Sequence, residues 1–214
     1  QKDASVRLVK RFPAERSLSD EVRNALSQML THSSKKLIIV GQKDENSELD
    51  RVIHQLAKLD SVVVLTEHTS NIKGDDLIEP IDSVLALIGT DPSYFPDLIF
   101  QVGDAIVSKR IKKYLRDTAA PVIAVDQMFD FADTFHNLHL SVDCSAEKTL
   151  KVVVSELAGQ TKSSGFSSLW LKAKADMLVA HRSYSENIGY SDFKVVEMIM
   201  KNLPGRTKLH FSNS

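Results

Sequence analysis

Short, uninterrupted apolar runs recur along the chain and are separated by longer segments with a helical spacing of apolar residues. The runs are rich in Val, Ile and Leu, which is typical of strands that are covered on both faces. They occupy residues 37–41, 62–65, 98–103, 122–126 and 139–143. Strands that alternate with helices predict an α/β fold, with a parallel, doubly wound, Rossmann-like sheet flanked by helices.

The segments around these runs predict helices, because their apolar residues recur every three to four positions and form one face. These segments cover residues 18–30, 49–59, 77–87, 105–116 and 145–157, and the helix within 77–87 is expected to begin near Pro80. A hydroxyl from Ser17 or Ser19 can cap the first helix, and Ser145 can cap the last. In the segment 105–116 we expect Val107 to face inward, together with Ile111 and Leu115.

A polar stretch of Gly, Ser, Thr, Gln and Lys at 159–165 interrupts this alternation and predicts a linker. Two amphipathic segments follow, and residues 208–211 predict an opening strand. We therefore divide the chain into a middle domain at 1–158, the linker at 159–165, and the start of a truncated second α/β unit at 166–214. The chain begins at Gln1 and stops after the last predicted strand, so we expect both ends to be boundaries within a longer protein.

Composition narrows the class of protein. The chain has 214 residues, of which 43% are hydrophobic and 26% charged, and its formal net charge is -1. A nearly neutral chain has no overall attraction for nucleic acid, so we expect no such partner. No apolar run approaches the ~20 residues that cross a bilayer, and we expect no transmembrane segment. The single cysteine, Cys144, permits no internal disulfide and suits a reducing compartment, so we expect a cytoplasmic location.

Several common kinds of site are not favoured by the sequence. A dinucleotide fingerprint needs several glycines after a strand, but only Gly41 follows the first strand and only Gly103 the third. His136 and His139 are three residues apart in a predicted loop, where this spacing does not bring two metal ligands together. We therefore predict no catalytic residue, no metal site and no bound cofactor within the chain itself.

Two polar clusters follow predicted strands. Glu67 and His68 come after the second strand, where they form either an acid–base pair or a solvated loop. Lys109 and Arg110 lie in the basic helix after the third strand, about 100° apart around its axis. They can therefore diverge around one anionic group or bind separate carboxylates, for which arginine offers a planar fork and lysine a compact charge. A solvated basic helix face is the alternative.

The segment 96–103, PDLIFQVG, together with VSKR at 107–110, resembles the middle domain of the 2-succinyl-5-enolpyruvyl-6-hydroxy-3-cyclohexene-1-carboxylate synthases, the MenD family. The final residues, FSNS, are similar to the Asn-Ser element that opens the diphosphate-binding domain of that family. The resemblance implies that Lys109 and Arg110 bind substrate carboxylates. It also implies that Ser214 and Asn213 contribute to the substrate site.

The same resemblance implies an activity for the longer protein. Members of this family decarboxylate 2-oxoglutarate on thiamine diphosphate, with Mg2+ or Mn2+, and add the succinyl carbanion to isochorismate in menaquinone (vitamin K2) biosynthesis. The coenzyme and metal lie between the pyrimidine-binding and diphosphate-binding domains of a homo-oligomer. The resemblance places those regions outside residues 1–214, so we expect the chain to be inactive alone and to supply part of the carboxylate site.

Two other interpretations remain open. The chain could be the middle domain of another thiamine-diphosphate enzyme, such as an acetohydroxyacid synthase relative, some of which bind FAD. It could instead be a non-catalytic α/β ligand-binding module. Compact burial of both helices between residues 166 and 203 favours a self-contained module, whereas exposed apolar surface on them favours a domain from a larger protein.

Overall fold

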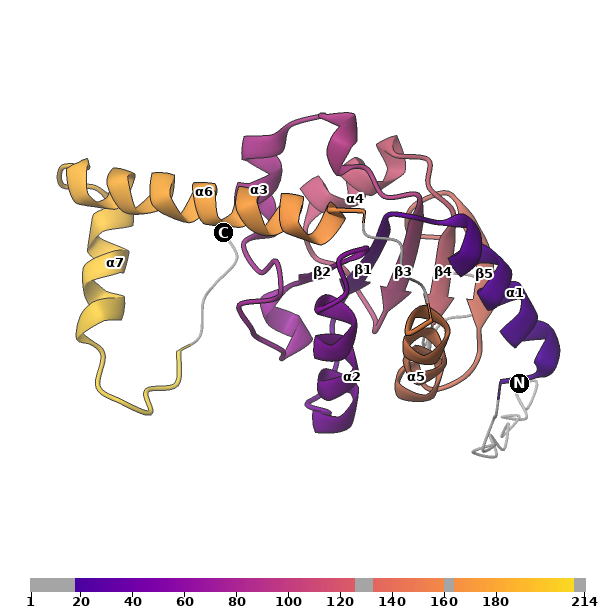
Figure 1. Cartoon of the computed structure of the whole chain (residues 1–214). Coiled ribbons are helices and arrows are strands. Elements are labelled where there is room, and N and C mark those ends of the chain that lie inside the picture. The colour runs from indigo at the N-terminus through magenta and orange to yellow at the C-terminus, as the bar shows by residue number, and fades with distance from the viewer. Residues whose placement is uncertain (1–17, 126–132, 160–163, 210–214) are drawn as a thin grey trace, which may run out of the picture.

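A computed structural model of the chain describes residues 18–125, 133–159 and 164–209. Its centre is a five-stranded sheet in the order β2-β1-β3-β4-β5, with every neighbouring pair parallel (Figure 1). The strands are β1 Lys36–Val40, β2 Val62–Thr66, β3 Leu98–Val102, β4 Val122–Val125 and β5 Leu138–Val142. The predicted parallel α/β sheet is confirmed.

Helices cover both faces of the sheet, and each face has its own apolar cluster. One layer consists of α1 Asp20–His32, α2 Ser47–Ala57 and α5 Ala146–Leu157. The other consists of α3 Ile81–Ile88, α4 Lys109–Asp117 and the first half of α6 Phe166–Asn187. The remaining helices are the short 3-10 turns η1 His68–Ser70 and η2 Pro92–Tyr94, and α7 Asp192–Asn202. No helix in the described ranges is both long and apolar enough to cross a membrane.

Side-chain caps fix where several helices begin. The Ser19 hydroxyl accepts a hydrogen bond from the Val22 amide at 3.3 Å, and Ser145 caps α5 in the same way through the Lys148 amide at 3.4 Å. Both predicted caps are therefore confirmed, whereas Ser17 lies outside the described residues. Cys144, the residue before the cap Ser145, is buried.

Some predicted boundaries were wrong. The helix expected at 105–116 begins only at Lys109, and Val107 is 48% exposed rather than inward. By contrast, the helix expected within 77–87 begins at Ile81 with Pro80 as its cap residue, which confirms the predicted start near Pro80. Strand β5 is not buried throughout but alternates, as expected for the edge of a sheet with one neighbour.

The predicted strand at 208–211 is not present in its described part, residues 208–209, and the rest lies outside the described residues. The division into 1–158, 159–165 and 166–214 stays a prediction.

Helix α6 begins on the sheet and then extends away from it (Figure 1). Its cap residue, Gly165, has no side chain, so the cap comes from elsewhere in the chain: the Asp60 carboxylate accepts from the Gly165 amide at 2.6 Å. Further along, the Lys174 ammonium donates to the Leu77 carbonyl at 2.7 Å and thereby joins α6 to the loop before α3. Polar contacts therefore anchor this half of α6 at both ends.

An aromatic cluster supplies the apolar part of this anchor. Trp170 is fully buried, and its ring packs edge-to-face against Tyr94, Tyr114 and Phe166 at centroid distances of 5.7, 6.2 and 6.4 Å. The Tyr114 hydroxyl donates to the Tyr94 carbonyl at 3.1 Å, and burial raises the pKa of that hydroxyl well above its usual range.

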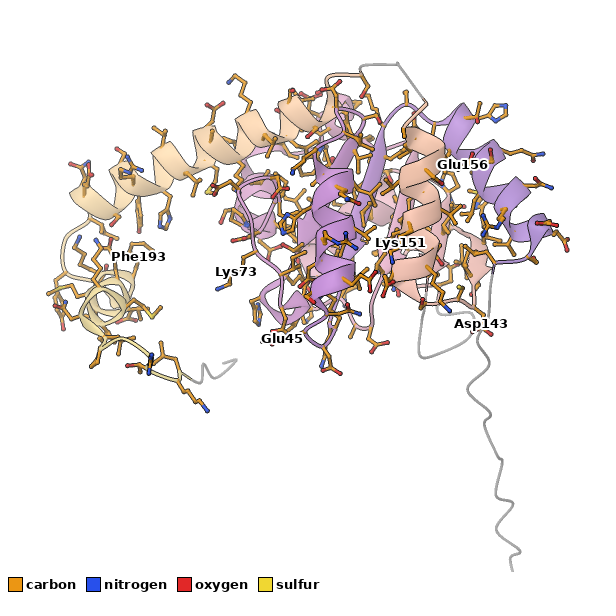
Figure 2. All side chains as sticks on the ribbon, turned by 60° about the horizontal axis from the view of Figure 1, so that its bottom comes forward. Glu45, Lys73, Asp143, Lys151, Glu156 and Phe193 are labelled. Carbon is orange, nitrogen blue, oxygen red and sulfur yellow. The ribbon has the colours of Figure 1, made fainter. Side chains whose placement is uncertain are left out.

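The second half of α6 forms a hairpin with α7. The ring of Phe193, labelled in Figure 2, packs against His181 and Tyr184 with centroids 5.6 and 5.5 Å away. The Glu197 carboxylate accepts from the ammonium groups of Lys201 at 2.6 Å and Lys194 at 3.0 Å.

None of the residues of α7 is buried. About half of each of four large apolar side chains is exposed to solvent: Val196, Met198, Ile199 and Met200. The exposed apolar surface of α7 is what we expected of a domain from a larger protein. The first half of α6, by contrast, is buried against the sheet, as expected of a self-contained module.

We predict that Trp170→Ala lowers the free energy of unfolding by about 3–5 kcal/mol, because it leaves a cavity among three aromatic rings. Urea denaturation measures this change. Tyr190→Ala is the control: Tyr190 is 94% exposed, and its loss should change stability by less than about 0.5 kcal/mol. Equal effects of the two substitutions would contradict the role given to Trp170.

We predict that Glu197 stabilises the hairpin in a pH-dependent way. Hydrogen bonds from Lys201, Ser185 and Lys194 lower the pKa of its carboxyl from 4.5 to about 2. The ionised form is favoured in the folded state, so this stabilisation is complete above pH 4.5 and lost as the pH falls toward 2. The Tm difference between the wild type and Glu197→Gln should therefore shrink over that interval. The exposed Glu186, replaced by Gln, should show no such trend.

Candidate functional site

The carboxyl ends of the parallel strands lie along one edge of the sheet, where ligands usually bind in such folds. Lys109 and Arg110 are the first two residues of α4, which follows β3 at this edge. Both side chains are exposed. The predicted basic pair is therefore at the carboxyl edge, whereas Asn213 and Ser214 lie outside the described residues and their part in the site stays a prediction.

Glu67, directly after β2, holds the amino end of α4. Its two carboxylate oxygens accept hydrogen bonds from the backbone amides of Val107 and Ser108, each at 2.7 Å. The glutamate is only 9% exposed, so these bonds are largely shielded from water. The acid–base interpretation of Glu67 and His68 is not supported, because the Glu67 carboxylate is bound to amides and His68 is exposed.

Asp82, in the first turn of α3, makes the second connection to α4. The Ser108 hydroxyl donates to its carboxylate at 2.5 Å and also accepts from the Ile111 amide at 3.1 Å, so Ser108 caps α4. The Arg110 guanidinium donates to the Asp82 carbonyl at 2.9 Å. This bond fixes the direction of Arg110 and leaves other guanidinium N–H groups for a ligand.

A cavity of about 370 Å³ lies beside this amino end, between η1, the start of α3 and the start of α4. Its size is in the range of small-molecule sites. Apolar side chains, including Ile72 and Val107, line part of it. Lys73, labelled in Figure 2, contributes a cation to its rim.

The carboxylates that line the cavity have hydrogen-bond donors of their own. Besides Glu67 and Asp82, Glu79 accepts from the Gly74 amide at 2.9 Å. Their negative charge is therefore partly compensated within the protein.

The crevice between β1 and β3 is different from a nucleotide site. In doubly wound sheets this point, where the strand order reverses, receives the phosphates. Here the loops after the two strands pair through their backbones. The Gln42 amide donates to the Ala105 carbonyl at 3.0 Å, and the Asp104 amide donates to the Gln42 carbonyl at 2.8 Å. Three acids, Asp44, Glu45 and Asp104, line the hollow beside them, which is about 250 Å³, and its one lysine, Lys43, is paired with Asp50 at 2.7 Å.

Two glycines permit this close pairing. A Cβ on Gly41 would lie 2.5 Å from the Asp104 carbonyl oxygen. Gly103 has φ of +75°, and a Cβ there would lie 2.9 Å from the Gln42 carbonyl oxygen. The glycines that we identified as too few for a phosphate loop therefore serve to bring two loops together.

The residues described do not fit thiamine diphosphate or its metal. Within residues 18–125, 133–159 and 164–209 no group of three His, Cys, Asp or Glu side chains is arranged to hold a metal ion. The Glu67 carboxylate already lies beside the start of α4, and the β1/β3 hollow is lined by three acids and by one lysine that is paired with Asp50, so both places disfavour a diphosphate. We therefore assign no step of coenzyme chemistry to these residues.

Sequence reasoning missed the role of Glu67. The signal available was an acid immediately after a buried strand, at the edge where the strands end. Its partners lie 40 and 41 residues further along the chain, and no local spacing indicates them.

We predict that Gly103→Ala lowers the free energy of unfolding by at least about 1–2 kcal/mol, because alanine is strained at positive φ and its Cβ would contact the Gln42 carbonyl. Gly189→Ala is the matched control, because a Cβ there meets nothing within 4 Å. Chemical denaturation of the two variants measures the difference. Equal stability would show that the loops can separate at little cost.

Comparison with known proteins gives relatives of a single kind. The chain is 30% identical to the 2-succinyl-5-enolpyruvyl-6-hydroxy-3-cyclohexene-1-carboxylate synthase of Porphyromonas gingivalis, over 95% of this chain and 37% of that protein. It is 35% identical to the synthase of the same name from Flavobacterium johnsoniae, and 31% identical to that from Flavobacterium psychrophilum. Each of these matches covers 85% of this chain and 33% of the relative.

No family model matches the chain. The chain spans only about a third of the length of these relatives, but the matches run through almost all of its own sequence. The resemblance first seen in two short segments therefore extends over the whole sheet and its helices. The chain belongs to the family of 2-succinyl-5-enolpyruvyl-6-hydroxy-3-cyclohexene-1-carboxylate synthases.

Proposed function

We propose that the protein containing this chain is a thiamine-diphosphate-dependent transferase that joins 2-oxoglutarate, with loss of carbon dioxide, to isochorismate in menaquinone biosynthesis. In this proposal the chain is the middle domain, continuing at 166–214 into the diphosphate-binding domain. Thiamine diphosphate and Mg2+ would supply the carbon–carbon chemistry from other parts of a homo-oligomer. The chain alone would bind only part of the substrate and would be inactive.

The name of the relatives describes the chemistry that such a site must recognise. Their product is a cyclohexene ring with a carboxylate, an enolpyruvyl group and a succinyl group. Each of these three substituents contains a carboxylate, so the site needs several cations and an apolar surface for the ring. Lys109 and Arg110 offer two adjacent cations directly after Ser108, which lines a partly apolar cavity of about 370 Å³ that the two cations themselves do not line.

We assign carboxylate binding to Lys109 and Arg110. The guanidinium of Arg110 is held by the Asp82 carbonyl and can still form a two-pronged contact with a carboxylate. Lys109 is exposed at the adjacent position and can reach a second oxygen or a second carboxylate. Ser214 and Asn213 would complete this contact in the longer protein. The observation that carries the proposal is this basic pair at the carboxyl edge of a chain with relatives in one synthase family.

We predict that Lys109→Ala and Arg110→Ala in the full-length synthase each raise the KM for isochorismate about 10- to 150-fold, the usual effect of losing a charged hydrogen bond. Decarboxylation of 2-oxoglutarate, measured without isochorismate, should change less than about twofold. Steady-state kinetics with each substrate separate the two effects.

Lys113→Ala is the control in the same helix, since Lys113 is paired with Asp117 at 2.5 Å and is 75% exposed. It should leave both parameters unchanged. A normal KM for isochorismate in both Lys109→Ala and Arg110→Ala would exclude the pair as the carboxylate site.

A further inference from the structure

We infer that Glu67 is an internal anion that positions Lys109 and Arg110 by binding the two backbone amides immediately before α4. This inference rests on the proposed function, because it concerns how the proposed carboxylate site is held. Glu67 is a positioning residue in this view: its carboxylate contacts the backbone before the pair and not the substrate.

The geometry of the contact resembles the binding of a free carboxylate. Both oxygens are used, one for the Val107 amide and one for the Ser108 amide, at equal distances of 2.7 Å. Val107 and Ser108 are the two residues immediately before α4, and Ser108 is its cap residue, so the Glu67 carboxylate lies next to the positive end of the helix and is stabilised there. Glu67 comes from β2, two strands away from the strand that leads into α4.

Glu67 is itself rigidly placed. Its amide donates to the Ser70 hydroxyl at 3.0 Å, and that hydroxyl donates to the Val40 carbonyl, the last residue of β1, at 2.6 Å. Ser70 is fully buried. A continuous set of hydrogen bonds therefore runs from the end of β1 through Ser70 and Glu67 to the residue that immediately precedes Lys109.

This arrangement has a consequence for specificity. An empty helix amino end binds carboxylate, phosphate and sulfate alike through its amides. Because the Glu67 carboxylate already lies at this end of α4 and the Ser108 hydroxyl caps the Ile111 amide, an incoming carboxylate meets the side chains of Lys109 and Arg110 instead. The direction of these two side chains then depends on the segment 103–108, which Glu67 holds at its end and Asp82 holds through Ser108.

The test is chemical rescue in the full-length synthase. Glu67→Ala removes the internal anion and should raise the KM for isochorismate at least about 10-fold, with decarboxylation of 2-oxoglutarate changed less than about twofold. Formate or acetate at millimolar concentration can bind the vacated amides and should lower that KM at least about threefold. Acetamide, which has a similar shape but no charge, should not.

Asp97→Ala is the matched control. Asp97 also accepts from two successive backbone amides, those of Ser34 and Lys35 at 2.9 and 2.8 Å, but at the amino edge of the sheet before β3. It should leave the KM for isochorismate within about twofold, and formate should have no effect on it.

The possible results separate this inference from the proposed function. If Lys109→Ala and Arg110→Ala raise the KM but Glu67→Ala does not, the inference about Glu67 is wrong and the site stands. If none of the three variants changes the KM, the proposed carboxylate site itself is wrong. Failure of both Glu67→Ala and Glu67→Gln to fold, or a raised KM that formate does not lower, would also overturn the inference, because Glu67 would then serve the fold alone.

Discussion

Backbone amides at the beginning of a helix must find acceptors, and the structure around α4 depends on how this requirement is met. The Ser108 hydroxyl accepts from the Ile111 amide in the first turn, and the carboxylate of Glu67, the residue after β2, accepts from the Ser108 amide and from the Val107 amide before it. Both groups connect α4 to elements earlier in the chain, η1 and α3. The position of Lys109 and Arg110 is thus a property of three elements together rather than of one helix.

The strands and the two helical layers could be predicted from the sequence, because buried strands have continuous apolar runs and the helices that cover them have one apolar face. The predicted runs that contain Ile38, in β1, and Val64, in β2, are apolar throughout, since the sheet is covered on both faces. Caps at Ser19 and Ser145 were also predictable, because a capping side chain contacts an amide only two or three residues away.

The rest of the site could not be predicted because it depends on contacts between distant segments. Val107 looked like an inward residue of a helix, but the hydrogen bond between its amide and Glu67 keeps it outside the helix. The basic pair was visible in the sequence and its role was implied by the resemblance to a family, whereas its surroundings were not predicted. Asp82, which holds both Ser108 and Arg110, gave no signal in the sequence.

The sheet has the doubly wound architecture of many nucleotide-binding proteins, but the place where those proteins bind phosphates is arranged differently. Where related topologies leave room for phosphates, the loops after β1 and β3 are joined by backbone hydrogen bonds at Gln42 and Asp104. Gly41 and Gly103 make this contact possible because they lack a Cβ. The absence of a side chain, usually associated with room for a ligand, here brings two loops into contact with each other.

Helix α6 has 22 residues, and the last of its residues packed in the sheet cluster is Met177. The remaining ten residues carry the α7 hairpin outward over about 15 Å, at 1.5 Å per residue. A helix is stiff, and the first half of α6 is held by the contacts at Asp60, Trp170 and Lys174. The second half therefore changes direction together with the first. A tilt of about 5° in the first half of α6 would move the carboxyl end of the helix by more than about one ångström. Small packing changes beside the sheet would thereby displace the exposed surface of α7, which they do not contact.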